Sequence, residues 1–446
     1  PSVRKLAAHL GVSRTPVEGA YQQLLAEGYV ASRPRSGIIV LPVEMELGRS
    51  AASAPIAPKP RMKSAQYPAA PDAPDWIDFA YGDVDLSHFP FQLWKKLLGS
   101  CFAPEHRDLF RYGDPRGEPS FRSALADYAY RARAVVCSPE QIIVGAGTHH
   151  SIEQLCRLLL HSPYSAAHTA IAVEEAMSDG IAALLRQYGY TLIPLRLEHD
   201  GICIEELYAS GAKMVYATPS HQFPHGMVMS IGKRRRLLSW AADTGGLIVE
   251  DDYDGEFRYA GMPVPSLQGL DTAGRVAYIG TFSRALAPAF RLSYAALPPA
   301  LADVAKAALH PFDRLASPLH QKTLELFMEG GHMQRHIRKM RSVYQRKLNV
   351  LLAASKRRLA PQFMLSGGAA GLHVLIAPTE GGAAGAVSET ELIRLASEQG
   401  VRVYPSSVYR VGSPPDRPAV LLGFGGLDER QIEDGIERLA LAWSSL

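Results

Sequence analysis

The chain has 446 residues, of which 47% are hydrophobic and 20% charged, and its formal net charge is +3. At about 150 residues per domain this length predicts two to four domains, and so small a charge does not by itself indicate binding to nucleic acid. No run of about 18 apolar residues occurs, so no transmembrane helix is expected. The cysteines Cys101, Cys137, Cys156 and Cys203 have no CxxC spacing, and we expect free thiols and a cytoplasmic location.

The first 41 residues predict two helices followed by two strands. Ser2–Leu10 has an amphipathic period that Gly11 ends, and Ser13 is a natural N-cap for a second helix. Tyr29–Val40 is typical of two strands joined by a turn. This order is that of a winged helix-turn-helix. Because the pattern begins partway into its motif at Pro1, we expect that the native N-terminus lies further upstream.

Basic residues outnumber acidic ones in this unit. The basic residues are Arg4, Lys5, Arg14, Arg33 and Arg35, and the acidic ones are Glu18 and Glu27. The difference, 5 − 2 = +3, equals the excess of the whole chain. Such a concentration is the electrostatic footprint of a phosphate-binding face, the alternative being a surface helix pair without a DNA-binding role.

Residues 42–75 have almost no apolar period and predict a linker with extended parts. Its prolines are Pro42, Pro55, Pro58, Pro60, Pro68, Pro71 and Pro74.

From Trp76 onward, short apolar runs alternate with helical patterns such as Ile181–Tyr188 and Lys233–Ala242. The strand candidates are Gln141–Val144, Thr169–Val173, Thr191–Leu195, Lys213–Ala217, Leu247–Glu250, Val276–Ile279 and Tyr294–Leu297. Strand and helix in alternation predict an α/β layer with a mostly parallel sheet.

A long helical region follows, from Pro299 to about Arg358, and then a smaller α+β part. The elements of that part are Gly371–Ile376, Gly400–Tyr404, Ala419–Phe424 and a helix at Glu429–Leu441. We therefore divide the body into a large subdomain at about 76–330 and a small subdomain at about 331–446.

The segment VGAGTHHSIE (Val144–Glu153) has the pattern of a strand, a glycine turn and a helix start. The backbone amides of Ala146, Gly147 and Thr148 are then placed to hold a phosphate at a helix N-terminus.

The head sequence PSVRKLAAHLGVSRTPVEGAYQQLLAEGYVASRPRSGIIV resembles the GntR superfamily of bacterial repressors. The resemblance implies DNA contacts at the start of the second helix and a wing tip in the minor groove, and it places the first helix of the domain before Pro1. Glu18 departs from the family, in which relatives can carry arginine there. The implied DNA-binding residues are Arg4, Ser13, Arg14, Thr15, Arg33, Arg35, Ser36 and Gly37.

The body resembles the fold-type I aminotransferases, which use pyridoxal phosphate (PLP). The motifs are RYGDPRGEPSFRSALADY, YATPSHQFPHG, LIVEDDYDGEFRY and YIGTFSRALAPAFRL. The resemblance implies that Asp251 pairs with the pyridine nitrogen, that Tyr253 meets the 3-oxygen and that Phe223 lies beside the ring. It implies phosphate contacts from Thr281, Ser283 and Arg291, and a Tyr112 that reaches the neighbouring subunit's site in a dimer.

Arg284 stands where these enzymes carry the lysine that forms the Schiff base. A guanidinium stays protonated and cannot form that bond, so we expect no internal aldimine and no catalytic residue. An active aminotransferase remains the alternative function. Three ligand states remain open: non-covalent PLP, PLP as an external aldimine with a free amino acid, or another anion. The sequence also leaves open whether the arginine is natural or engineered.

A GntR-type head joined to a fold-type I body resembles the MocR subfamily of transcription regulators, of which the gamma-aminobutyrate-responsive type is the best known. The resemblance implies a head-to-tail, domain-swapped homodimer, double-stranded operator DNA, PLP and an amino-acid-like effector. Ala176 and Ser178 replace the usual proline and tyrosine, and Leu421 replaces a carboxylate-binding arginine. These departures argue against gamma-aminobutyrate, and Arg402 and Arg410 are the substitute effector-binding candidates.

Overall fold

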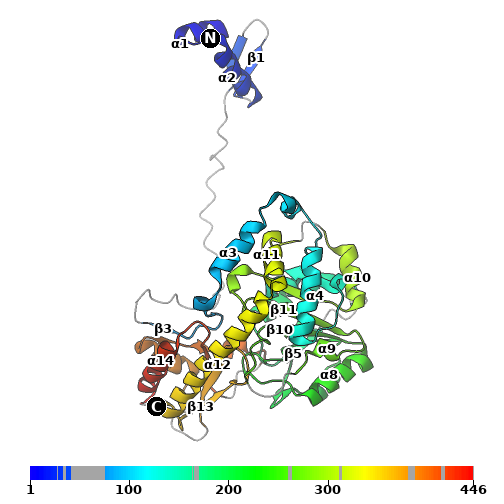
Figure 1. The fold of residues 1–446 in the computed structure, drawn as a ribbon, viewed down its shortest axis with the longest axis vertical. Coiled ribbons are helices and arrows are strands. Elements are labelled where there is room, and N and C mark those ends of the chain that lie inside the picture. The colour runs from blue at the N-terminus through cyan, green and yellow to red at the C-terminus, as the bar shows by residue number, and fades with distance from the viewer. Residues whose placement is uncertain are drawn as a thin grey trace, which may run out of the picture. The chain divides into compact units, whose positions relative to one another are not determined.

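The computed structural model describes residues 1–27, 29–33, 37–41, 76–162, 164, 170–259, 264–310, 314–379, 387–412, 417–444 and 446. The chain divides into two compact units, Pro1–Ala69 and Ala70–Leu446. Each is described by itself, and Figure 1 labels their elements. The linker predicted at 42–75 lies outside the described residues. No helix in the described parts of the chain is long and apolar enough to span a bilayer.

The first unit contains α1 (Val3–Leu10), α2 (Arg14–Ala26), β1 (Val30–Arg33) and β2 (Gly37–Val40), as predicted. The Ser2 hydroxyl accepts the Lys5 N–H at 3.3 Å and caps α1. Gly11 ends α1 with φ 65°, a left-handed conformation that favours glycine. The two strands pair in antiparallel fashion. The helix-turn-helix and its β-hairpin are therefore present.

The second unit is built on a seven-stranded sheet, in which all seven strand predictions are confirmed to within two residues at each end. Its strand order is β4 (Ile142–Gly145), β12 (Ser293–Ala296), β11 (Val276–Thr281), β10 (Leu247–Asp252), β9 (Met214–Ala217), β5 (Ala170–Glu174) and β6 (Thr191–Leu195). All neighbours are parallel except those of β12, which is antiparallel to both β11 and β4. The prediction of a mostly parallel sheet is confirmed.

Helices cover both faces of this sheet because successive strand residues point to opposite sides. On one face, Ile171 and Val173 pack with helices α5 (Thr148–Leu160), α6 (Asp179–Gln187) and α10 (Pro299–Ala308). Ala172 faces the other side. The helices of that second face are α3 (Phe91–Ser100), α4 (Pro119–Arg133), α7 (Ile204–Ala209), α8 (Ile231–Thr244), α9 (Leu267–Leu270) and α11 (Pro318–Glu329). The result is a three-layer α/β/α arrangement.

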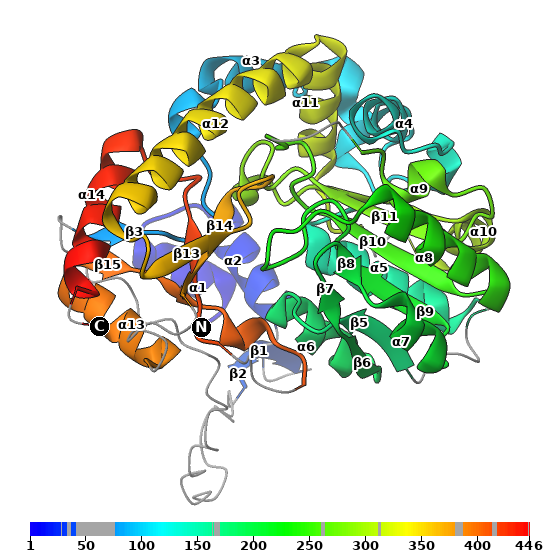
Figure 2. The same ribbon diagram turned by 90° about the horizontal axis from the view of Figure 1, so that it is seen from below.

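A smaller α+β part follows the long helix α12 (His332–Arg358), which contacts both α11 and the C-terminal helix α14 (Glu429–Ala442) (Figure 2). Its antiparallel sheet has the order β13 (Phe363–Ser366), β14 (His373–Pro378), β17 (Val420–Gly423) and β16 (Tyr404–Pro405). Its other elements are β15 (Val401–Arg402), α13 (Glu389–Glu398) and α14 (Glu429–Ala442). The predicted strand at Gly400–Tyr404 thus splits into two short strands in different sheets.

β3 (Ile77–Asp78) belongs to this smaller part although it opens the body in sequence. It pairs in parallel with β15, with Ile77 opposite Val401. The Phe79 side chain that follows is fully buried and packs against Gly435 of α14, where an added Cβ would lie 2.6 Å from the ring. The pairing fixes the start of the body next to its C-terminal helices.

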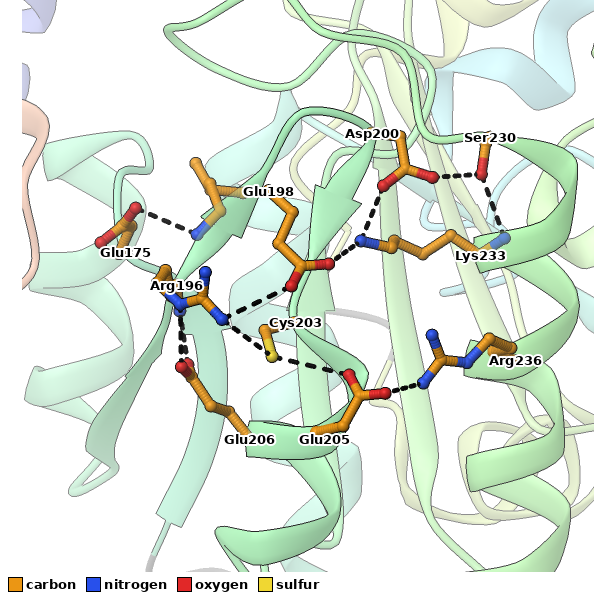
Figure 3. A network of polar contacts seen from close by, with 11 residues as sticks. Glu175, Arg196, Glu198, Asp200, Cys203, Glu205, Glu206, Ser230, Lys233 and Arg236 are labelled. Atoms are coloured by element: carbon orange, nitrogen blue, oxygen red, sulfur yellow. Dashed lines mark hydrogen bonds and ion pairs between the residues drawn. The ribbon is translucent and has the colours of Figure 1, made fainter.

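A network of ion pairs joins the hairpin β7 (Leu197–Glu198) and β8 (Gly201–Ile202) to α7 and α8 (Figure 3). Lys233 of α8 contacts Glu198 at 2.5 Å and Asp200 at 2.7 Å. Arg196 contacts Glu206 of α7 at 3.2 Å. The Arg196 pair is exposed and contributes about 0–1 kcal/mol, whereas the Lys233 side chain is buried and its two carboxylate partners are partly exposed. We interpret the network as local support for the hairpin.

Candidate functional site

The carboxyl ends of β10 and β11 and the N-terminus of α5 border a cavity of about 250 Å³. Ligands of open α/β sheets bind at this edge. The predicted cofactor-binding residues that line it are Thr148, Phe223, Asp251, Tyr253, Thr281, Ser283, Arg284 and Arg291. Sequence segments more than 140 residues apart thus meet in one pocket.

Asp251, near the carboxyl end of strand β10, is a buried carboxylate with a hydrogen bond to only one of its oxygens. The Tyr216 hydroxyl of β9 donates to its Oδ2 at 2.6 Å. Its Oδ1 has no hydrogen-bond partner among the described residues. Burial raises the pKa of Asp251 to about 7, and the Tyr216 hydrogen bond opposes that rise. A buried acceptor of this kind suits a ligand N–H, above all a cationic one.

Tyr253 is held by a layer of buried polar side chains. Its hydroxyl donates to the backbone oxygen of His221 at 2.8 Å, and His221 Nδ1 lies 2.9 Å from Asp254 Oδ2. The His373 ring is 4.7 Å from that of His221. The ligand atoms of His221, Asp254 and His373 lie within 4.8 Å of one another, close enough to hold a metal ion. Because both imidazoles already have protein partners, we interpret the group as support for Tyr253.

Other residues of the cavity lining carry groups that suit an anion. Thr281 Oγ1 donates to Ser283 Oγ at 3.1 Å. The Arg291 guanidinium lies directly against Gly147, where an added Cβ would be 2.2 Å from Nη2. Gly147 also has φ +94°, a backbone conformation that favours glycine. No carboxylate of the described residues pairs with Arg291. With Thr148 at the positive end of α5, these groups have the charge and the donors that suit an anion.

The backbone N–H of Ala146 is predicted from the sequence to donate to a phosphate. In the structure it donates to His150 Nδ1 at 2.9 Å. Neither Ala146 nor Gly147 lines the cavity itself.

Arg284 lies in the cavity with its guanidinium over the Tyr81 ring, 4.3 Å from Cζ to the ring centre. Burial alone would lower the pKa of Arg284, but Tyr81, Asp254 and Tyr253 hold it above its ordinary value. The group is therefore a permanent cation.

Three further predicted residues, Tyr112, Arg402 and Arg410, lie outside this cavity. Tyr112 is 77% exposed. Arg402 pairs with Asp78 at 3.5 Å, and Arg410 pairs with Glu175 at 3.2 Å. The roles of all three stay predictions.

Sequence reasoning did not select Tyr81 or Tyr216, which both line the cavity. Tyr216 stands in a quoted motif, at the position where β9 meets β10, and could have been found there. Tyr81 follows a two-residue strand and carries no local signal.

In the head, the predicted DNA-binding residues Arg4, Ser13, Arg14, Thr15, Arg33 and Gly37 are all exposed. Arg35 and Ser36 lie outside the described residues. Arg14 and Thr15 open α2, and Ser13 stands at its N-cap position without a side-chain cap bond. No acidic side chain of the described residues pairs with Arg4, Arg14 or Arg33, so these cations are available to a phosphate backbone.

Residues 74–439 match the family aminotransferase class I and II, and residues 1–40 match the bacterial regulatory proteins of the gntR family. The HTH-type transcriptional regulator YdeL of Bacillus subtilis is 38% identical over 99% of this chain and 91% of its own length. The probable rhizopine catabolism regulatory protein MocR of Rhizobium meliloti is 35% identical over 100% of this chain and 89% of its own length.

Among solved structures, a multiple substrate aminotransferase from Thermococcus profundus matches with a TM-score of 0.74 and 26% identity, covering 84% of this chain and 92% of that one. The chain therefore belongs to the MocR-type transcriptional regulators, in which a GntR helix-turn-helix head is joined to a body of the class I and II aminotransferase family.

Proposed function

We propose that this protein is a bacterial cytoplasmic transcription regulator that binds operator DNA with its head and senses a PLP-type ligand with its body. The observation that carries the proposal is the combination, on one chain, of the exposed cations Arg4, Arg14 and Arg33 in the head with the unsatisfied Oδ1 of buried Asp251. The first suits DNA phosphates, and the second suits a protonated pyridine nitrogen.

The residues of the cavity fit PLP. Asp251 Oδ1 would accept the pyridine N–H, and Tyr253 and Phe223 would position the ring. Thr281, Ser283 and Arg291, with the Thr148 end of α5, would hold the phosphate. Bound PLP supplies an electrophilic aldehyde, and the residues of this chain would orient the molecule and exclude water from it.

We infer that binding, and not amino-group transfer, is the task of the body. No lysine is among the described residues that line the cavity. Lys213 is exposed and donates to the backbone oxygen of Thr244, away from the pocket. A sensor needs only different affinities for its ligand in two states of the protein. Catalysed amino transfer between an amino acid and a keto acid would contradict this inference.

Replacing Arg14 tests the DNA-binding role. We expect Arg14→Ala in the full-length protein to weaken binding to its own upstream DNA about tenfold, because a phosphate or base contact worth about 1–3 kcal/mol is lost. If the contact is to phosphate, the slope of log K against log salt concentration falls by about 0.9. The matched control is Arg131→Ala on α4 of the body, which is expected to leave both quantities unchanged. Equal affinities of Arg14→Ala and the unaltered protein across the salt series would contradict the role.

We propose a head-to-tail, domain-swapped homodimer in which Tyr112 enters the partner's pocket. The segment before α4 exposes three phenylalanines, Phe91, Phe102 and Phe110, by 57–60%. The Phe102 and Phe110 rings lie 5.7 Å apart and form one apolar patch. Such a patch is typical of a subunit interface.

Light scattering on the purified protein is expected to give twice the chain mass. We expect the double variant Phe102→Ser and Phe110→Ser to shift the protein toward monomer with an unchanged far-ultraviolet circular dichroism spectrum. The control Tyr130→Ser removes an aromatic ring that is 63% exposed on α4 and is expected to leave the dimer intact. A monomer mass for the unaltered protein at micromolar concentration would remove the proposal.

Asp251 is expected to lower the stability of the ligand-free protein. Its pKa is raised from 3.8 to about 7 in the folded state, so its ionisation costs folding free energy. The cost is absent below pH 3.8, grows up to pH 7 and is complete above it, on the order of a few kcal/mol. Asp251→Asn keeps an acceptor for Tyr216 and removes the charge.

We therefore expect Asp251→Asn to raise the Tm of the ligand-free body by several degrees at pH 8 and by less at pH 5, and to abolish the rise in Tm that PLP causes. The measurement is thermal unfolding followed by tryptophan fluorescence, and the control is Asp303→Asn at an exposed position of α10. A lower Tm of the variant at pH 8 without ligand, or an unchanged response to PLP, would show that Asp251 has another role.

A further inference from the structure

The cavity contains a second cationic group besides the phosphate site. Arg291 lies against Gly147 at the start of α5, whereas Arg284 lies over the Tyr81 ring beside Gly82. Asp251 is the single carboxylate among the described residues that line the cavity. The cavity lining therefore carries two guanidinium groups and one carboxylate. The phosphate of a ligand would pair with only one of the two guanidinium groups.

Arg284 has no anionic partner of its own. Its guanidinium forms no ion pair with any described carboxylate, and the nearby Asp254 is engaged by His221 at 2.9 Å. What holds Arg284 is the aromatic face of Tyr81. Because no described carboxylate pairs with this guanidinium in the cavity, the group favours a ligand that brings an anion to it.

The backbone next to Arg284 leaves room for such an anion. Gly82 has no side chain, and a Cβ there would lie 3.5 Å from Nη1 of Arg284, in contact with the donor. The planar guanidinium presents paired N–H groups whose spacing matches the two oxygens of a carboxylate. A cationic ammonium group at the same place would be repelled.

We propose that Arg284 is a carboxylate-binding residue, and that the body selects phosphorylated pyridines that also carry a carboxylate over those that carry an ammonium group. The inference rests on the proposed function and names the ligand class of the same pocket. The phosphate of the ligand meets Arg291, its ring nitrogen meets Asp251 and its carboxylate meets Arg284. A cofactor oxidised to the acid and a cofactor condensed with an amino acid are two sources of this chemistry.

The test compares three probes by isothermal titration of the full-length protein. They share the phosphorylated pyridine and differ at one substituent: 4-pyridoxic acid 5′-phosphate carries a carboxylate, PLP an aldehyde and pyridoxamine 5′-phosphate an ammonium group. We expect the carboxylate to bind at least tenfold tighter than the ammonium compound. Arg284→Gln is expected to reduce that preference to less than about twofold, whereas Arg291→Gln weakens all three probes and keeps the order.

A second pair of probes separates the two sources. PLP mixed with glycine brings a carboxylate, and PLP mixed with methylamine does not. Tighter binding with glycine alone supports the condensed cofactor, and tight binding of only the pyridoxic acid phosphate supports the oxidised one.

The preference of the unaltered protein decides the inference without reference to any variant. Equal binding of the three probes, or tightest binding of pyridoxamine 5′-phosphate, would overturn the role of Arg284 while leaving the proposed pocket in place. If no probe binds while the protein still binds its upstream DNA, the proposed ligand class and this inference both fail.

Discussion

The buried carboxylate of Asp251 is the constraint around which the pocket is organised. The parallel pairing of β9 and β10 places Tyr216 beside it, and that hydroxyl satisfies only one of its oxygens. Asp251 is buried beside the further acidic residues Glu250 and Asp252, so its unsatisfied oxygen and its charge raise the free energy of the ligand-free protein. A ligand with a protonated ring nitrogen relieves this cost. Removal of this cost would therefore contribute to the free energy of ligand binding.

The chemistry of this cavity explains how an aminotransferase-like body can serve a regulator. Catalysis of amino transfer needs a group that forms and breaks a bond to the cofactor, whereas sensing needs only differential affinity. Arg284 cannot form that bond, but it is a fixed cation in a cavity that retains Asp251, Thr281, Ser283 and Arg291. We therefore propose that Arg284 alters which ligands this cavity recognises.

The sequence predicted the large sheet well, because its buried strands are short apolar runs between helical patterns. It missed β3, β13 and α13, and it merged β15 with β16. β3 has only two residues, and its partner β15 lies more than 320 residues further along the chain. No local sequence pattern could predict that pairing, and the position of Tyr81 depends on it.

The residues of the candidate site likewise fall into those that a motif could predict and those whose contacts depend on the tertiary fold. Asp251, Thr281 and Ser283 follow strand ends, so motif and topology together brought them to one cavity. The contacts of Arg402 with Asp78 and of Arg410 with Glu175 depend on packing between distant segments, which a motif cannot supply. The layer of His221, Asp254 and His373 under Tyr253 is likewise a product of the tertiary fold.

A regulator that senses a ligand with its body requires that occupancy of the body alters DNA binding by the head. The most direct measurement is the affinity of the full-length protein for its upstream DNA at fixed salt, with and without saturating ligand from the probe series. A coupling free energy of about 1–3 kcal/mol predicts a change of roughly 5- to 150-fold, and Asp251→Asn should show none. Identical affinities with and without a ligand that calorimetry shows to be bound would contradict the claim.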